Sequence, residues 1–159
     1  MTDAGSTRAA DRRALSRAAR LYAVQALFQM EAAGQSAERV TREFRDYRID
    51  ADDRDGPTEP ADEALFERIL DQVVTWQSRI DQATDRGLVA RWPIDRIDPV
   101  LRALFRAAGA ELVIGKAPAK VVISEYVRLC EAFFPEGREA KFVNAVLDHV
   151  ARDLRPDDF

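Results

Sequence analysis

The most informative segment of this 159-residue chain is Lys141-Phe142-Val143-Asn144-Ala145-Val146-Leu147-Asp148. Its apolar residues recur with the period of an α-helix and form one stripe that a helix would bury. The stripe consists of Val143, Val146, Leu147 and Val150. Lys141 and Phe142 lie beside it, at the N-terminal end. We therefore expect a helix that is anchored in a core and presents a cation and an aromatic ring at its entrance.

An aromatic pair and a turn precede this helix, in the stretch Phe133-Phe134-Pro135-Glu136-Gly137-Arg138. A cation and two aromatic side chains then converge on one helix entrance. Such a group can hold a phosphate and stack an unpaired base. The alternative is that both rings belong to the core, which is the more frequent fate of an isolated Phe at helical spacing.

Helical periodicity continues through most of the chain, and no series of strands or internal repeats interrupts it. The expected helices cover about residues 10–32, 36–47, 61–81, 85–90, 98–114, 118–129 and 138–153. In the third helix the residues predicted to point inward are Leu65, Ile69, Val73, Trp76 and Ile80. Asp98 precedes Pro99 as a typical N-cap, while Gly34 and Gly115 are placed to end helices. These patterns predict an all-α protein with about seven helices.

The length leaves room for one domain, which could have two lobes. Residues 1–10 are mostly small and polar, so we expect a flexible N-terminal arm. Residues 50–60 combine carboxylates with two prolines and a glycine, and they predict a polar loop. The remaining chain, about 11–155, is expected to form the folded domain.

Charge is distributed unevenly along the chain. The net charge is −4, which argues against a uniformly basic nucleic-acid binder. Residues 1–20 nevertheless hold five arginines against two aspartates, and helical spacing places Arg13, Arg17 and Arg20 on one sector. Residues 46–67 hold nine carboxylates against two arginines. A local basic face could bind RNA, while the acidic remainder repels RNA or meets a basic protein. A plain solvated helix face is the alternative for the arginines.

Residues suited to catalysis are scarce. The sequence has no glycine-rich phosphate loop, and one cysteine with one histidine cannot form a zinc cluster. Nothing pairs Cys130 with His149, and a lone cysteine cannot form an intramolecular disulfide, which fits a reducing cytoplasm. No apolar run is long enough to span a membrane, and the N-terminus does not resemble a secretory signal. A cytoplasmic binding protein is favoured over an enzyme.

Three segments together resemble the bacterial transcription antitermination factor NusB family. The first is Arg17-Ala-Ala-Arg20-Leu-Tyr-Ala-Val-Gln-Ala-Leu-Phe28, although the family's arginine cluster is usually denser. The second joins Pro99-Val-Leu-Arg102-Ala-Leu and Glu111-Leu112 to Pro118-Ala-Lys-Val-Val-Ile-Ser-Glu125-Tyr-Val. The third, and most specific, runs from Phe134 through Lys141-Phe-Val-Asn-Ala-Val-Leu-Asp148. The resemblance covers most of residues 12–150.

The resemblance implies two small helical bundles packed together, about 11–82 and about 83–155. It implies a protein without catalytic activity, metal or cofactor. Members of the family bind the box A element of nascent ribosomal RNA transcripts and pair with NusE, a small-subunit ribosomal protein. The pair joins other Nus factors on RNA polymerase and suppresses premature termination. Some relatives self-associate, so a homodimer is left open here.

Carried over by position, the resemblance assigns two faces. The RNA face comprises Arg13, Arg17, Arg20, Phe134, Arg138, Lys141 and Phe142. The partner face comprises Asp95, Asp98 and Arg102, at the entrance of the fifth expected helix. Carboxylates there suit a basic ribosomal protein. Asp98 as a plain N-cap is the alternative for that residue.

Two other functions are weighed against antitermination. A protein-interaction adaptor with little RNA binding of its own would fit the net charge. An RNA-binding module related to those of RNA methyltransferases is the other, and it is disfavoured because the chain has no cofactor loop. Binding to box A RNA with and without NusE would separate these functions.

Overall fold

The computed structural model describes residues 3–49, 60–88 and 97–159, with side chains from Asp11 onward. Within these ranges every regular element is a helix, which confirms the predicted all-α class. The elements are α1 (Asp3–Ala33), α2 (Ala37–Tyr47), α3 (Glu63–Gly87), α4 (Pro99–Ile114), α5 (Ala119–Phe133), α6 (Arg138–Leu154) and a 3-10 turn (Pro156–Asp158). The described part of the chain thus holds six α-helices and one 3-10 turn, close to the seven helices expected.

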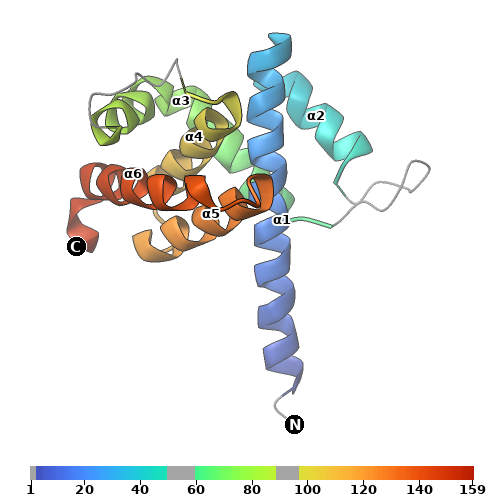
Figure 1. The fold of residues 1–159 in the computed structure, drawn as a ribbon. Coiled ribbons are helices and arrows are strands. Elements are labelled where there is room, and N and C mark those ends of the chain that lie inside the picture. The colour runs from blue at the N-terminus through green and yellow to red at the C-terminus, as the bar shows by residue number, and fades with distance from the viewer. Residues whose placement is uncertain (1–2, 50–59, 89–96) are drawn as a thin grey trace.

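The long helix α1 organises the molecule (Figure 1). Helix α2 lies on one side of it, and α4, α5 and α6 lie on the other. The N-terminal part of α1 projects beyond the other helices, and its regular structure begins at Asp3. The sequence had predicted a helix only from about residue 10, so the helical part of α1 is longer than expected.

Helix α3 differs most from its prediction. The expected helices 61–81 and 85–90 are not separate, because α3 runs from Glu63 to Gly87. A kink at Trp76, with φ −116° and ψ 17°, interrupts its regular geometry. With this non-helical backbone, Trp76 is 39% exposed and lies under the Arg79 guanidinium instead of pointing inward, although Val73 before it and Ile80 after it are both buried. The prediction of an inward Trp76 was therefore wrong.

Local sequence signals set the helix ends as predicted. The Asp98 carboxylate accepts a hydrogen bond from the backbone N–H of Val100 at 2.7 Å, so Asp98 is the N-cap of α4. Gly115 ends that helix with φ 76°, a left-handed conformation that glycine adopts without a steric penalty. Gly34 follows α1 with φ 65°.

One continuous core joins all six helices. The predicted α6 stripe is buried in it, as are the α4 residues Leu101, Leu104, Ala108 and Leu112. Helices α3 and α4 approach so closely that a Cβ on Gly109 would lie 2.4 Å from Ile80 Cγ2. Packing of this density fixes the relative positions of the surface groups described next. The division into bundles at about residue 82 stays a prediction.

Candidate nucleic-acid interface

The three α1 arginines of the predicted RNA face lie at different depths. Arg13 is exposed. The Arg17 side chain is partly exposed, and its Nε donates to Glu125 Oε2 of α5 at 3.0 Å. Arg20 is only 8% exposed. Helical spacing placed them correctly on one sector of α1, but only Arg13 and Arg17 reach the surface.

Arg20 belongs to a buried polar cluster that joins α1 to α4 and α5. Its Nε donates to both carboxylate oxygens of Glu111, at 2.9 and 3.1 Å, and its Nη1 lies 3.9 Å from Glu125 Oε2. Burial raises the pKa of the Glu111 carboxyl, and the attraction of the Arg20 guanidinium opposes that rise. These contacts hold α1 against the body of the protein. A phosphate on this face would meet Arg13 and Arg17 first, and direct contact with Arg20 stays a prediction.

The entrance of α6 has the exposed chemistry that its sequence indicated. Gly137, with φ 77°, turns the chain into α6, and the cationic side chains of Arg138 and Lys141 are exposed. In the described part of the chain neither cation forms an ion pair. Phe142 is 39% exposed, and the rest of its ring packs edge-on against buried Phe105, with centroids 6.2 Å apart. Phe142 therefore combines partial packing with an accessible surface.

Phe134 ends α5 and is half-buried against the core, with its backbone N–H bonded to Cys130 O. It therefore contributes both to packing and to the surface of the turn before α6. The alternative that both rings are fully core is wrong for Phe142 and only partly right for Phe134.

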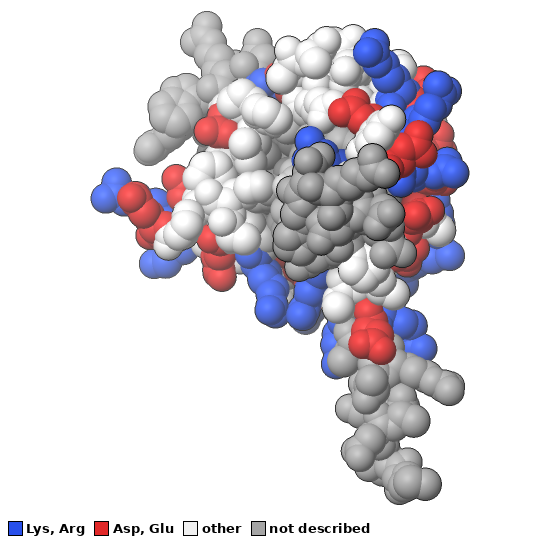
Figure 2. Space-filling model, turned by 90° about the vertical axis from the view of Figure 1, so that its right-hand side faces the viewer, with Lys and Arg blue, Asp and Glu red and all other residues white. Residues whose placement is uncertain are grey.

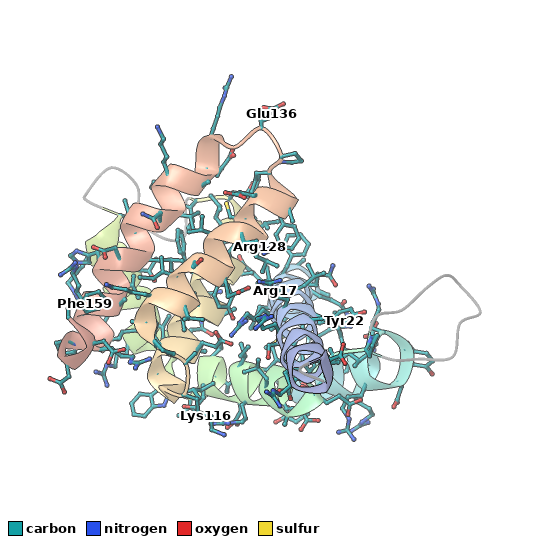
Figure 3. The ribbon with its side chains drawn as sticks, turned by 90° about the horizontal axis from the view of Figure 1, so that it is seen from below. Arg17, Tyr22, Lys116, Arg128, Glu136 and Phe159 are labelled. Carbon is teal, nitrogen blue, oxygen red and sulfur yellow. The ribbon has the colours of Figure 1, made fainter. Side chains whose placement is uncertain are left out.

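Helix α5 lies between the α1 arginines and the turn before α6 (Figure 3). Arg17 on α1 contacts Glu125 on α5, about one turn before Arg128, and Glu136 marks the turn at the far end of α5. Arg128 is exposed, as is Lys120 two turns earlier on the same helix. Neither cation was among the predicted RNA-binding residues. Their spacing around Ser124, at i, i+4 and i+8, was the signal that could have found them.

The predicted partner face is only partly described. Asp95 lies outside the described residues. Asp98 is exposed at the start of α4. Arg102, by contrast, is buried, pairs with Glu31 of α1, and donates to the carbonyl of Ile97 at 3.2 Å. Arg102 thus ties α4 to α1. Little of its side chain is accessible to a partner, so its predicted role in partner binding stays a prediction.

An apolar hollow of about 420 Å³ lies beside Asp98 and was not anticipated. Its lining includes Phe28, Ala32, Phe44, Val100 and Phe133, from α1, α2, α4 and α5. Phe28 is 39% exposed. On the face drawn in Figure 2, charged side chains gather at the edges and at the base of α1, and much of the upper surface is uncharged. The possible signal was Phe28 itself, which falls outside the apolar helical stripe that the sequence predicts for this helix, namely Leu15, Ala19, Tyr22, Ala26 and Met30.

Other chemistry is not supported by the described residues. Burial raises the pKa of the Cys130 thiol to about 11, so the thiolate that a nucleophile needs is scarce at neutral pH. In ranges 3–49, 60–88 and 97–159, no three His, Cys, Asp or Glu side chains are placed to hold a metal ion. Nor does any helix in those ranges have the length and apolarity needed to cross a membrane.

Curated relatives match this chain over nearly its whole length. A transcription antitermination protein NusB from Maricaulis maris is 47% identical over 150 residues, covering 94% of this chain and 93% of the relative. The protein of the same description from Caulobacter vibrioides is 44% identical over 138 residues, covering 86% and 92%.

Solved structures share the fold. The T. maritima NusB structure superposes with a TM-score of 0.72 at 27% identity, over 90% of this chain and 95% of that one. A chain from the crystal structure of a plectonemic RNA supercoil has a TM-score of 0.66 at 24% identity, which shows the fold alone. The NusB family model matches residues 17–152, so this chain belongs to the NusB family of transcription antitermination proteins, which are not enzymes.

Proposed function

We propose that this protein binds the box A element of nascent ribosomal RNA together with NusE, as part of the Nus complex on RNA polymerase. Family membership supports a role in antitermination. The observation that carries the RNA proposal is the α6 entrance, where an exposed part of the Phe142 ring stands beside Arg138 and Lys141, two cations without an ion-pair partner among the described side chains.

Each group at this entrance has a distinct role in the proposal. Single-stranded RNA is bound through stacking of its bases on aromatic side chains and through cations along its backbone. The Phe142 ring takes an unstacked base, and Phe134 borders the same turn. Arg138 and Lys141 hold the neighbouring phosphates, helped by the positive end of α6. Arg13 and Arg17 on α1 continue the electrostatic contact.

The salt dependence of binding tests this account. Four exposed cations at about −0.7 per contact give a log–log slope of about −3 for single-stranded RNA. Fluorescence anisotropy of labelled box A RNA across a salt series measures the slope, with and without NusE. We expect weak binding by the chain alone and tighter binding with NusE, because the net charge of −4 opposes RNA.

A scrambled RNA of the same length is the specificity control in these titrations. Affinity that does not change with salt would refute the electrostatic account. Tight NusE binding with no box A affinity in either mixture would favour the protein-interaction adaptor, for which the acidic net charge is the specific observation.

The partner face in this proposal is the apolar hollow together with Asp98. Aromatic and aliphatic residues around a pocket supply the buried centre of many interfaces, and carboxylates at the rim steer a basic partner. The Asp98 carboxylate accepts a hydrogen bond from the backbone N–H of Val100 at 2.7 Å, and Val100 lines the hollow, so the carboxylate lies near its rim.

Two substitutions separate the charge of Asp98 from its capping role. Asn is about as good an N-cap as Asp, so Asp98→Asn removes the charge and keeps the cap. We expect Asp98→Asn to slow association with NusE, and Asp98→Lys to slow it further, with salt reducing both differences. Stopped-flow mixing measures the association rate. Unchanged rates for both variants would place the partner face elsewhere.

A further inference from the structure

A second hollow, near the start of α5 and therefore at the other end of that helix from the α6 entrance, has no assigned role. It measures about 330 Å³ and lies between α1, the start of α3 and the end of α4. Ser16, the buried Arg20–Glu111 pair and the apolar side chains of Leu65 and Ile114 line it. Arg68 and Lys116 complete the lining as cations.

Three cations line this hollow, Arg20, Arg68 and Lys116, against the two carboxylates of Asp62 and Glu111, so the lining has an excess of positive charge. The Glu111 carboxylate is engaged by Arg20, and the Asp62 carboxylate accepts the backbone N–H of Leu65 at 3.0 Å as the N-cap of α3. Among the residues with described side chains, neither Arg68 nor Lys116 has an acidic partner. The hollow therefore favours a ligand with negative charge at the rim and an apolar, hydrogen-bonding body inside.

The hollow is continuous with the basic face of α1. Ser16 and Arg20 line it on one side and also line a neighbouring depression together with Arg12 and Arg13. Viewed from below, Glu136 at the α6 turn, Arg128, Arg17 and Lys116 follow one another across the molecule (Figure 3). A strand that leaves the α6 entrance and follows the seam between α5 and α1 toward the start of α5 would arrive at Lys116.

We propose that this hollow takes up a further unstacked nucleotide of the bound single-stranded RNA, with its phosphates on Arg68 and Lys116. The base lies against Leu65 and Ile114, and its polar edge faces Ser16 and the Arg20–Glu111 pair. Extruded bases are bound in this way, between apolar side chains and polar groups that read the base edge. This inference rests on the proposed RNA-binding function and extends the RNA path beyond α1.

The test uses the full chain with NusE and a box A RNA extended at either end. Arg68→Ala and Lys116→Ala should each reduce the steepness of the log–log salt slope by about 0.7, and the double variant by about twice that. Each loss should weaken binding by up to about fivefold at low salt, the range of one exposed ion pair. Arg79→Ala is the matched control, because Arg79 is on the same helix but beyond the kink at Trp76.

A second measurement locates the base. RNA that carries 4-thiouridine at successive positions should crosslink to peptides containing Leu65 or Ile114 at one position beyond those that crosslink to α1. Wild-type binding with an unchanged slope in the double variant, or without such a crosslink, overturns this inference and leaves the proposed function standing. Absence of RNA binding by the wild-type chain with NusE overturns both.

Discussion

Replacing Phe142 tests whether an aromatic ring at the α6 entrance stacks on RNA. The substitution affects two free energies, that of unfolding and that of RNA binding. A fully buried Phe changed to Ala costs about 3–5 kcal/mol of stability. Phe142 is more than a third exposed and makes one edge-on aromatic contact, with Phe105, so Phe142→Ala should cost about 1–2 kcal/mol of unfolding free energy. Stacking on a base is worth about 1–3 kcal/mol, so RNA affinity should fall about 5- to 150-fold.

Phe142→Leu sharpens this experiment because leucine keeps apolar contact with Phe105 but cannot stack on a base. We expect Phe142→Leu to retain most of the stability and to lose most of the RNA affinity that Phe142→Ala loses. Phe159→Ala is the matched control, since that ring is similarly exposed but lies at the C-terminal 3-10 turn. It should change neither NusE binding nor RNA binding.

Thermal melting, RNA anisotropy and NusE titration are measured on the same preparations of each variant. The reasoning is refuted if Phe142→Ala melts far below the wild type and loses NusE and RNA binding in parallel. In that case the ring acts as core. It is equally refuted if Phe142→Leu binds RNA as tightly as the wild type does.

Three further predictions concern the packing and the buried polar groups. Gly109→Ala should lower stability by about 1–3 kcal/mol, because the new Cβ would meet Ile80 Cγ2 at 2.4 Å; a melting temperature at or above that of the wild type would contradict this. Tyr126→Phe should preserve or raise the melting temperature, because the buried Tyr126 hydroxyl has no hydrogen-bond partner among the described residues, and a clear drop would indicate a partner. The hydrogen bond from Arg102 lowers the pKa of Glu31 below its ordinary value of 4.5. The ionised carboxylate therefore stabilises the fold at pH values above 4.5, and this stabilisation is lost as the pH falls through the lowered pKa. Glu31→Gln should therefore be less stable than the wild type at pH 7 in denaturant titrations, with a difference that shrinks in acid; a constant difference would argue against the pair.

The helices could be predicted from the sequence because helical periodicity and helix caps depend on residues only a few positions apart. The 3.6-residue period identified the α6 stripe, and the chemistry of Asp98 and Gly115 identified both ends of α4. The kink at Trp76 was missed because the apolar spacing continues through it without interruption. No residue type there signals a break, and the buried stripe keeps its seven-residue spacing from Val73 to Ile80 across the kink.

How deeply each charged side chain of the candidate site is buried could not be predicted from the sequence. Arg13, Arg17 and Arg20 are equivalent by helical spacing. What distinguishes them is the position of Glu111 and Glu125, which lie 91 residues after Arg20 and 108 after Arg17, respectively. Likewise, Arg102 was expected at a partner surface. It is buried, and it pairs there with Glu31 of α1, which lies 71 residues earlier in the sequence.

Ion pairs reduce the number of arginines in the basic N-terminal segment that are available to RNA. Five arginines in residues 1–20 indicate strong RNA attraction if each is treated as a free charge. Arg20 is neutralised by Glu111, and Arg17 is shared with Glu125. A buried pair contributes little net stability, but removing one partner leaves an uncompensated charge and typically costs about 3–5 kcal/mol. Arg20→Ala would consequently displace α1 as well as remove a cation, so its effect on RNA binding would not measure a direct contact. The exposed cations at the α6 entrance and the second hollow are the positions where charge and structure can be varied separately.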